Sequence, residues 1–185
     1  MIQKRKKLFV YGLGLIGGSV AKAFKNHGWQ VSGLDLNDKT TVRAIEEDII
    51  ESEVLSSSVD LVMIATPAGS VAEIANEVLG EVGPQTIVSD TASVKTSIVA
   101  KIDDVRFIGG HPMAGSELKG LDGSREDLFI NCNWVLTPHD STSTDSFVRL
   151  HGYIRELGAN VLSISASDHD RLVAVASHVP HILAG

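Results

Sequence analysis

One glycine-rich segment near the start of the chain constrains its fold more than any other feature. An apolar run at residues 8–11 leads directly into Gly12, Gly14 and Gly17, and residues 19–27 then have the character of a helix. A strand, a glycine turn and a helix in this order are typical of a dinucleotide-binding unit. In such a unit Gly12 allows the tight turn, Gly14 lets the backbone approach a pyrophosphate, and Gly17 lets the helix pack closely on the strand.

The residues around this turn predict NAD as the bound dinucleotide. The first turn of the helix, with Leu15 and Ile16, offers free N–H groups and a partial positive charge to the phosphates. Asp35 ends the next apolar run, about 20 residues on, where a carboxylate accepts hydrogen bonds from the adenosine ribose. Because a carboxylate repels a 2′-phosphate, NAD is favoured over NADP, and Arg43 is the residue that could soften this preference.

A signal peptide is the alternative interpretation of the same segment. The basic residues 4–7, the apolar run behind them and the small residues of Ala21-Lys22-Ala23 fit such a peptide with its cleavage site. The spacing of the glycines and the position of Asp35 favour the nucleotide-binding turn, because a signal peptide requires neither. The basic residues are then a solvated tail.

Composition restricts the class of protein. A chain of 185 residues that is 43% hydrophobic suits one globular domain and the beginning of another. The net charge of −7 argues against nucleic-acid binding, and no apolar stretch is long enough to span a bilayer. Cys132 is the only cysteine, so no internal disulfide can form, which suits the cytoplasm.

Apolar runs alternate with helical patterns along the chain. Strands are expected at residues 61–65, 86–90, 105–108, 134–136 and 161–164. Helices are expected at residues 19–27, 39–48, 71–79, 95–102 and 147–157. This alternation predicts an α/β fold with a doubly wound, mainly parallel, Rossmann-type sheet. Ligands of such sheets bind beyond the carboxyl ends of the strands, so Thr66 and Pro67 are expected at the cofactor.

A histidine directly follows one of the expected strands. Residues 109–117 read GGHPMAGSE, and Pro112 favours an extended backbone at His111. An imidazole titrates near neutral pH, so His111 is a candidate general base. A histidine in a surface loop is the alternative for this residue taken alone.

With the glycine turn, three motifs resemble the prephenate and arogenate dehydrogenases of tyrosine biosynthesis: DTASVK (90–95), GGHPMAGSE (109–117) and DHDRLVAVASHVPH (168–181). The resemblance covers nearly the whole chain. It implies NAD-dependent oxidative decarboxylation of prephenate to 4-hydroxyphenylpyruvate, or of arogenate to tyrosine. Hydride leaves the hydroxyl-bearing ring carbon for the nicotinamide, and loss of CO2 makes the ring aromatic. Which of the two substrates is used stays open.

The same resemblance implies roles for individual residues. His111 accepts the proton of the ring hydroxyl, and Ser93, beside the nicotinamide and that hydroxyl, helps to orient it. Glu117 lies at the mouth of the site, and the substrate also contacts His181 and, as a weaker choice, His178. Ser93 as a helix N-cap and Glu117 as a solvated loop residue are the plainer alternatives.

Two further features receive no role in the reaction. Lys95 is expected on the surface of a helix. The residues 168–170 together with the histidines of the last motif could be nominated as metal ligands. Hydride transfer to a nicotinamide needs no metal, so none is expected.

Residues 1–166 are expected to form the NAD-binding domain. Residues 167–185 are expected to begin an all-helical dimerisation domain that is mostly absent, because the chain stops within an apolar helical segment without a cap. The resemblance implies a homodimer through those missing helices and a small-molecule substrate, with neither nucleic acid nor membrane as partner. Another NAD-dependent Rossmann dehydrogenase and a non-catalytic NAD-binding regulatory module are the alternative functions.

Overall fold

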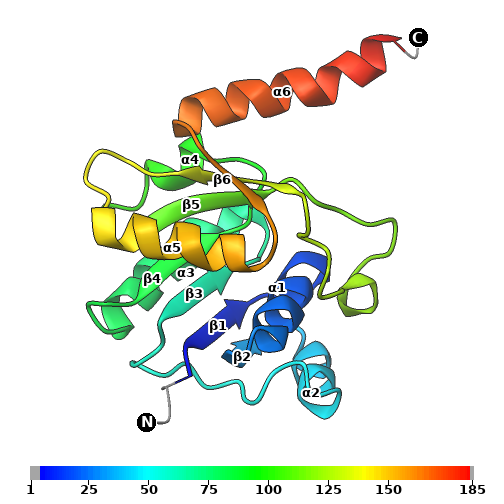
Figure 1. The fold of residues 1–185 in the computed structure, drawn as a ribbon, viewed down its shortest axis with the longest axis vertical. Coiled ribbons are helices and arrows are strands. Elements are labelled where there is room, and N and C mark those ends of the chain that lie inside the picture. The colour runs from blue at the N-terminus through cyan, green and yellow to red at the C-terminus, as the bar shows by residue number, and fades with distance from the viewer. Residues whose placement is uncertain (1–4, 184–185) are drawn as a thin grey trace.

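A seven-stranded sheet lies at the centre of the computed structural model, which describes residues 5–183, with side chains described as far as residue 175 (Figure 1). Its strand order is β2-β1-β3-β4-β5-β6-β7. The first five are parallel, β6 runs antiparallel to β5, and β7 is parallel to β6. The strands are β1 (Lys7–Tyr11), β2 (Gln30–Leu34), β3 (Leu61–Ile64), β4 (Ile87–Asp90), β5 (Phe107–Pro112), β6 (Asn133–Thr137) and β7 (Asn160–Ser163).

Helices cover both faces of this sheet, which confirms the doubly wound, mainly parallel Rossmann-type prediction. One buried cluster packs side chains of α1, α2 and α5 on one face, and a second packs those of α3 and α4 on the other. The last helix, α6, extends away from the sheet (Figure 1). The helices are α1 (Leu15–Asn26), α2 (Asp38–Glu46), α3 (Ala68–Glu81), α4 (Thr96–Val99), α5 (Thr144–Glu156) and α6 (Ala166–Leu183), with a short 3-10 turn at Leu121–Gly123.

The central strands are buried on both faces, as the continuous apolar run at residues 61–65 predicts for β3. All four residues of β3 and all four of β4 are buried. A parallel strand between two helical layers exposes neither face to water, so alternation of polar and apolar residues is lost. The edge strand β7, in contrast, is mostly exposed.

Two elements differ from the sequence-based expectation. The strand expected at residues 105–108 runs from Phe107 to Pro112, because Gly109 to Pro112 pair with β6 in an antiparallel ladder. The helix expected at residues 95–102 is confined to Thr96–Val99, and the following residues form turns. His111 therefore lies within the last part of a strand and not in the loop that follows it.

The sheet reverses its strand order at β1, which has β2 on one side and β3 on the other. The loops that leave β1 and β3 lie against each other there: a Cβ atom on Gly12 would come within 2.7 Å of the carbonyl oxygen of Ala65. In open α/β sheets such a reversal opens a crevice at the carboxyl ends of the strands, where ligands bind.

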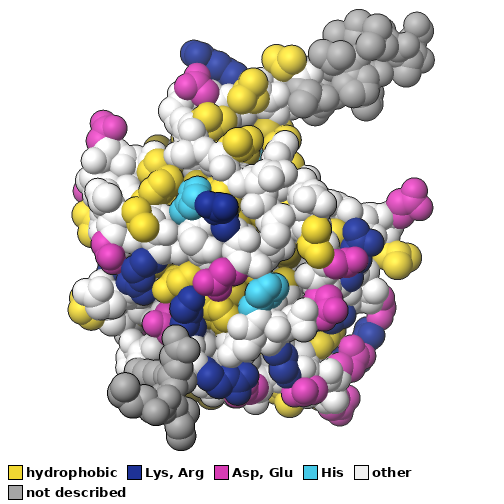
Figure 2. Space-filling model, viewed as in Figure 1, with side chains coloured by type: hydrophobic (Ala, Val, Ile, Leu, Met, Phe, Trp, Pro, Cys, Tyr) yellow, Lys and Arg dark blue, Asp and Glu magenta, His cyan; other side chains and the backbone are white. Residues whose placement is uncertain are grey.

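Charged side chains of both signs are mixed on the face of the molecule seen in Figure 2, without one dominant basic region. Leu172 and Val175 are apolar and exposed on α6. In the part of the chain that the structure describes, no helix combines the length and the apolar character that crossing a membrane requires.

Replacing Gly17 with alanine should destabilise the fold, because the new Cβ would lie 1.8 Å from the carbonyl oxygen of Gly12. We expect the free energy of unfolding, measured by urea titration, to fall by at least about 2 kcal/mol. Gly80→Ala is the matched control, since Gly80 is also helical and a Cβ there meets nothing within 4 Å. Its stability should stay unchanged or rise by up to about 1 kcal/mol. Equal stability of the two variants would contradict this account of the packing.

Candidate functional site

The glycine turn between β1 and α1 forms a cradle at the start of the helix. Gly12 has a φ of +84°, which favours glycine, and its N–H donates to the carbonyl of Leu34 at 2.8 Å. Gly17 has no room for a side chain, so α1 packs directly on the turn. A Cβ on Gly14, the N-cap residue of α1, would meet nothing within 4 Å. The protein's own packing therefore gives no reason for glycine at position 14, and the space in front of it is open for a ligand.

Asp35, directly after β2, faces this turn. One carboxylate oxygen accepts from the N–H of Leu13 at 2.8 Å, and the other accepts from the N–H of Asn37 at 2.9 Å. The carboxylate thus lies against the glycine turn, half-buried and fixed by two backbone groups. Arg43, the residue expected to bind a 2′-phosphate if any does, is instead paired with Glu47 at 2.5 Å and with Asp122 at 2.6 Å.

A buried ion pair lies under the carboxyl ends of β4 and β5. Asp90, the last residue of β4, pairs with Lys95, and neither side chain is exposed to solvent. Lys95 Nζ also donates to the carbonyl of Gly110 at 2.7 Å, and Asp90 accepts from the N–H groups of Gly110 and Ala92 at 3.1 and 2.9 Å. Burial raises the pKa of Asp90 and lowers that of Lys95, while their mutual contact opposes both shifts.

The prediction that Lys95 lies on a helix surface is therefore wrong. Its backbone forms the N-cap of α4, but its side chain turns inward to Asp90 rather than outward to water. A buried ammonium needs a counter-charge and acceptors, and both are supplied here by β4 and β5. Position in a short helix alone does not indicate which way such a side chain points.

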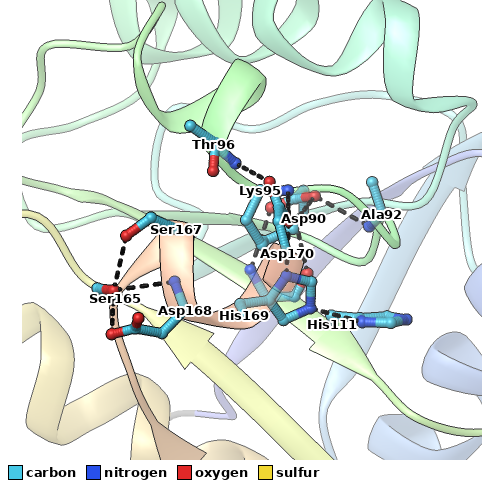
Figure 3. Close-up of polar contacts among 11 residues, drawn as sticks. Asp90, Ala92, Lys95, Thr96, His111, Ser165, Ser167, Asp168, His169 and Asp170 are labelled. Atoms are coloured by element: carbon cyan, nitrogen blue, oxygen red, sulfur yellow. Dashed lines mark hydrogen bonds and ion pairs between the residues drawn. The ribbon is translucent and has the colours of Figure 1, made fainter. Parts of the chain in front are cut away.

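His111 at the end of β5 is held by a second histidine, His169, in the first turn of α6 (Figure 3). His111 Nδ1 and His169 Nε2 are 2.8 Å apart, and His169 Nδ1 is 2.8 Å from Oδ1 of Asp170. Asp170 Oδ1 and Oδ2 also accept from the backbone N–H groups of Lys95 and Thr96, at 2.8 and 2.9 Å. The side chains of His111, His169 and Asp170 thus form one hydrogen-bonded chain that ends on α4.

The electrostatic surroundings keep His111 neutral at physiological pH. Burial, followed by the proximity of His169 and Lys95, lowers the pKa of His111 to about 4, and Asp170 only partly opposes this. Although burial alone would raise it, hydrogen bonds from Thr96 and His169 hold the pKa of Asp170 well below its usual range. The site therefore combines a neutral imidazole with a fixed carboxylate two hydrogen bonds away.

The other residues expected at the site lie apart from this chain of contacts. Ser93 is exposed in the loop before α4, and the first N–H groups of that helix are capped by Asp170 rather than by Ser93. Glu117 is exposed in the loop after β5. Thr66 is half-buried and Pro67 exposed at the start of α3, on the same edge of the sheet as the glycine turn.

His178 and His181 lie outside the residues whose side chains are described. His169 and Asp170 are the residues that sequence reasoning missed as partners of His111. Both belong to the DHD sequence at residues 168–170, which opens the last family motif but by itself suggests only possible metal ligands. Among the described residues, no three His, Cys, Asp or Glu side chains are grouped as metal ligands.

Comparison with known proteins identifies the family of the chain. Residues 20–163 match the family described as prephenate dehydrogenase, nucleotide-binding domain. A prephenate dehydrogenase of Bacillus subtilis is 33% identical over an alignment that covers 100% of this chain and 53% of the relative. A cyclohexadienyl dehydrogenase of Zymomonas mobilis is 31% identical, with 97% of this chain and 65% of the relative covered.

Solved structures give the same result. A prephenate dehydrogenase from A. aeolicus, in complex with hydroxyphenyl propionate and NAD+, superposes with a TM-score of 0.89 at 29% identity, covering 100% of this chain and 68% of the other. Synechocystis arogenate dehydrogenase gives a TM-score of 0.86 at 32% identity, covering 94% and 65%. The chain spans about half the length of the Bacillus relative. By fold, by sequence and by the match over residues 20–163, this chain belongs to the prephenate dehydrogenase nucleotide-binding domain family.

Proposed function

We propose that this chain is the nucleotide-binding part of an NAD-dependent enzyme that oxidatively decarboxylates prephenate or arogenate. One observation carries the proposal: a neutral, anchored imidazole, His111, lies at the same edge of the parallel sheet as an open glycine cradle. A base beside a dinucleotide site is the arrangement that oxidation of an alcohol requires.

The glycine turn supports NAD as the cofactor. In the proposed complex, the pyrophosphate lies over Gly14, against the N–H groups of Leu15 and Ile16, where the start of α1 favours negative charge. Gly12 and Gly17 give the turn its shape. The carboxylate of Asp35 would accept hydrogen bonds from the ribose hydroxyls and repel a 2′-phosphate. Thr66 and Pro67, at the start of α3, would contact the cofactor.

When bound, NAD supplies the acceptor for the hydride that leaves the hydroxyl-bearing ring carbon. His111 Nε2 takes the hydroxyl proton as that O–H bond breaks, so the carbon can become a carbonyl. The electrons of the carbon–carboxylate bond then enter the ring as CO2 leaves, and the ring oxygen becomes a phenolate. His111 returns the proton to this oxygen, so the imidazole ends neutral and the ring aromatic.

The remaining site residues are assigned to the substrate. Ser93, exposed in the loop before α4, would contact the ring hydroxyl, and Glu117, exposed after β5, would lie at the mouth. His181 and, more weakly, His178 would contact the substrate from the last helix.

We also infer that the chain functions in the cytoplasm as part of a homodimer. Residues 1–166 would form its NAD-binding domain, and residues 167–185 would begin a helical domain that makes the dimer contacts. The exposed Leu172 and Val175 on α6 support such a contact.

Asp35→Asn should weaken NAD binding and reduce the ratio of the affinity for NAD to the affinity for NADP. Loss of one charge-assisted hydrogen bond to the ribose predicts a Kd for NAD that is roughly 10-fold to 100-fold higher. Binding of NAD and NADP to the chain can be measured by isothermal titration calorimetry, with Asp38→Asn as a control because Asp38 lies nearby in the first turn of α2. An unchanged ratio of the two affinities would show that Asp35 does not read the ribose.

His111→Asn should abolish most turnover and leave NAD affinity intact. Loss of the base predicts a fall in kcat of roughly 10²-fold to 10⁴-fold. The rate is measured as formation of reduced nicotinamide, with prephenate and arogenate offered separately. His139→Asn is the control, because that ring contacts Ser141 and Asp104 and not the site. Full activity of the His111 variant would reject the proposed role.

The lowered pKa of His111 predicts an unusually acidic lower limit of activity. Only the neutral imidazole accepts a proton, so kcat/KM should fall as the pH drops through about 4, and not near the ordinary histidine value of about 6.5. The pH profile should be recorded over the range in which circular dichroism reports a folded chain. A loss of activity centred near the ordinary value would contradict the burial-driven shift.

A further inference from the structure

Two of the three hydrogen-bonded side chains His111, His169 and Asp170 have no role in the proposed reaction, and the imidazole of His169 is the one that contacts the base directly. Its side chain is 1% exposed, and it comes from α6, which follows β7 at the far end of the sheet order. The two imidazole rings meet edge to face, with centroids 5.0 Å apart and planes at 75°. In this geometry a nitrogen of one ring points at a nitrogen of the other, as Figure 3 shows.

The direction of the hydrogen bonds follows from the carboxylate. Asp170 is ionised and already accepts two backbone N–H groups, so it can only accept from His169. His169 Nδ1 therefore carries a hydrogen. An imidazole whose single hydrogen is on Nδ1 bears a lone pair on Nε2 that can only accept, so in this arrangement the hydrogen between the two rings belongs to His111 Nδ1. The free nitrogen of His111, Nε2, is left as an acceptor.

We infer that His169 is a positioning residue that fixes His111 in the tautomer with hydrogen on Nδ1 and a lone pair on Nε2. The inference rests on the proposed function of His111 as base and adds the residue that sets its protonation geometry. The logic is that of a catalytic triad, in which a buried acceptor selects the tautomer of the reacting imidazole. Here a second imidazole stands between the carboxylate and the base.

The surrounding residues hold both ends of this chain in place. Asp170 is fixed by the N–H groups of Lys95 and Thr96, and the Nζ atom of the same Lys95 binds the carbonyl of Gly110, immediately before His111. Asp90, at the end of β4, is the remaining charged group beside the site, and it pairs with Lys95. A shared anchor at Lys95 keeps β5 and α6 at the separation that the bond between the two imidazoles requires.

The arrangement also offers a hydrogen-bond acceptor to the charged state of the base, although burial still holds the pKa of His111 at about 4. When His111 Nε2 accepts a proton, the Nδ1–H of the imidazolium already points at a lone pair on His169. The ring of His169 is in turn polarised by the carboxylate of Asp170, so the new positive charge faces acceptors rather than apolar surface.

Nitrogen NMR of the isotope-labelled 185-residue chain tests the inference directly, because the two nitrogens of each imidazole report which one carries hydrogen. In the wild-type chain at neutral pH, His111 should carry hydrogen on Nδ1. In His169→Leu, which offers no acceptor, a large share of His111 should shift its hydrogen to Nε2. In His169→Gln, whose side-chain oxygen can still accept, the wild-type tautomer should persist. His139→Leu is the control and should leave His111 unchanged.

Turnover supplies the second readout. His169→Leu should lower kcat by roughly 10²-fold with KM changed by less than about threefold, and His169→Gln should recover to within about tenfold of wild type. Full activity of His169→Leu would overturn the inference. A wild-type His111 with hydrogen on Nε2 would do so as well, even if no leucine variant folds.

The two proposals fail in different ways. If the wild-type protein turns over neither substrate, the proposed function loses its support. The tautomer of His111, measured in the wild-type protein and in His169→Gln, still decides the role of His169.

Discussion

The buried contact between Asp90 and Lys95 is the interaction on which the rest of the site depends. Two opposite charges without solvent exposure must satisfy each other and their remaining hydrogen-bonding capacity within the protein. They do so through the backbone of Gly110 and Ala92, which joins the end of β4 to β5. Because the N–H of Lys95 also binds Asp170, the same residue connects the sheet to α6. Removing either charge would leave the other buried without its counter-charge.

Much of the fold can be read from the sequence because it depends on local patterns. The fully buried strand β3 appears as an unbroken apolar run, and the glycines of the first turn appear at the spacing that close packing of α1 requires. The position of His111 near a strand end also follows from such a run. These features concern residues that are neighbours in the chain, where propensity and periodicity carry information.

The contacts of the site could not be read in the same way. Lys95 occupies a position where a helical surface is the ordinary expectation, and only the return of its side chain to Asp90 shows otherwise. His111 and His169 are 58 residues apart in the chain, and no spacing rule links them. The extension of β5 through Pro112 likewise requires β6, a strand that arrives later and runs the other way. Each case depends on which distant segments become neighbours in space.

Because α6 begins at the site and extends away from the sheet, a rotation of the whole helix would displace the residues of its first turn (Figure 1). Its first turn holds both His169 and Asp170. The bond between the imidazoles is 2.8 Å long, and a displacement of about 1 Å at the base of the helix would take it outside hydrogen-bonding range. Any contact that fixes the orientation of α6 therefore also fixes the hydrogen bond between His169 and His111, and with it the position of the hydrogen on the His111 ring.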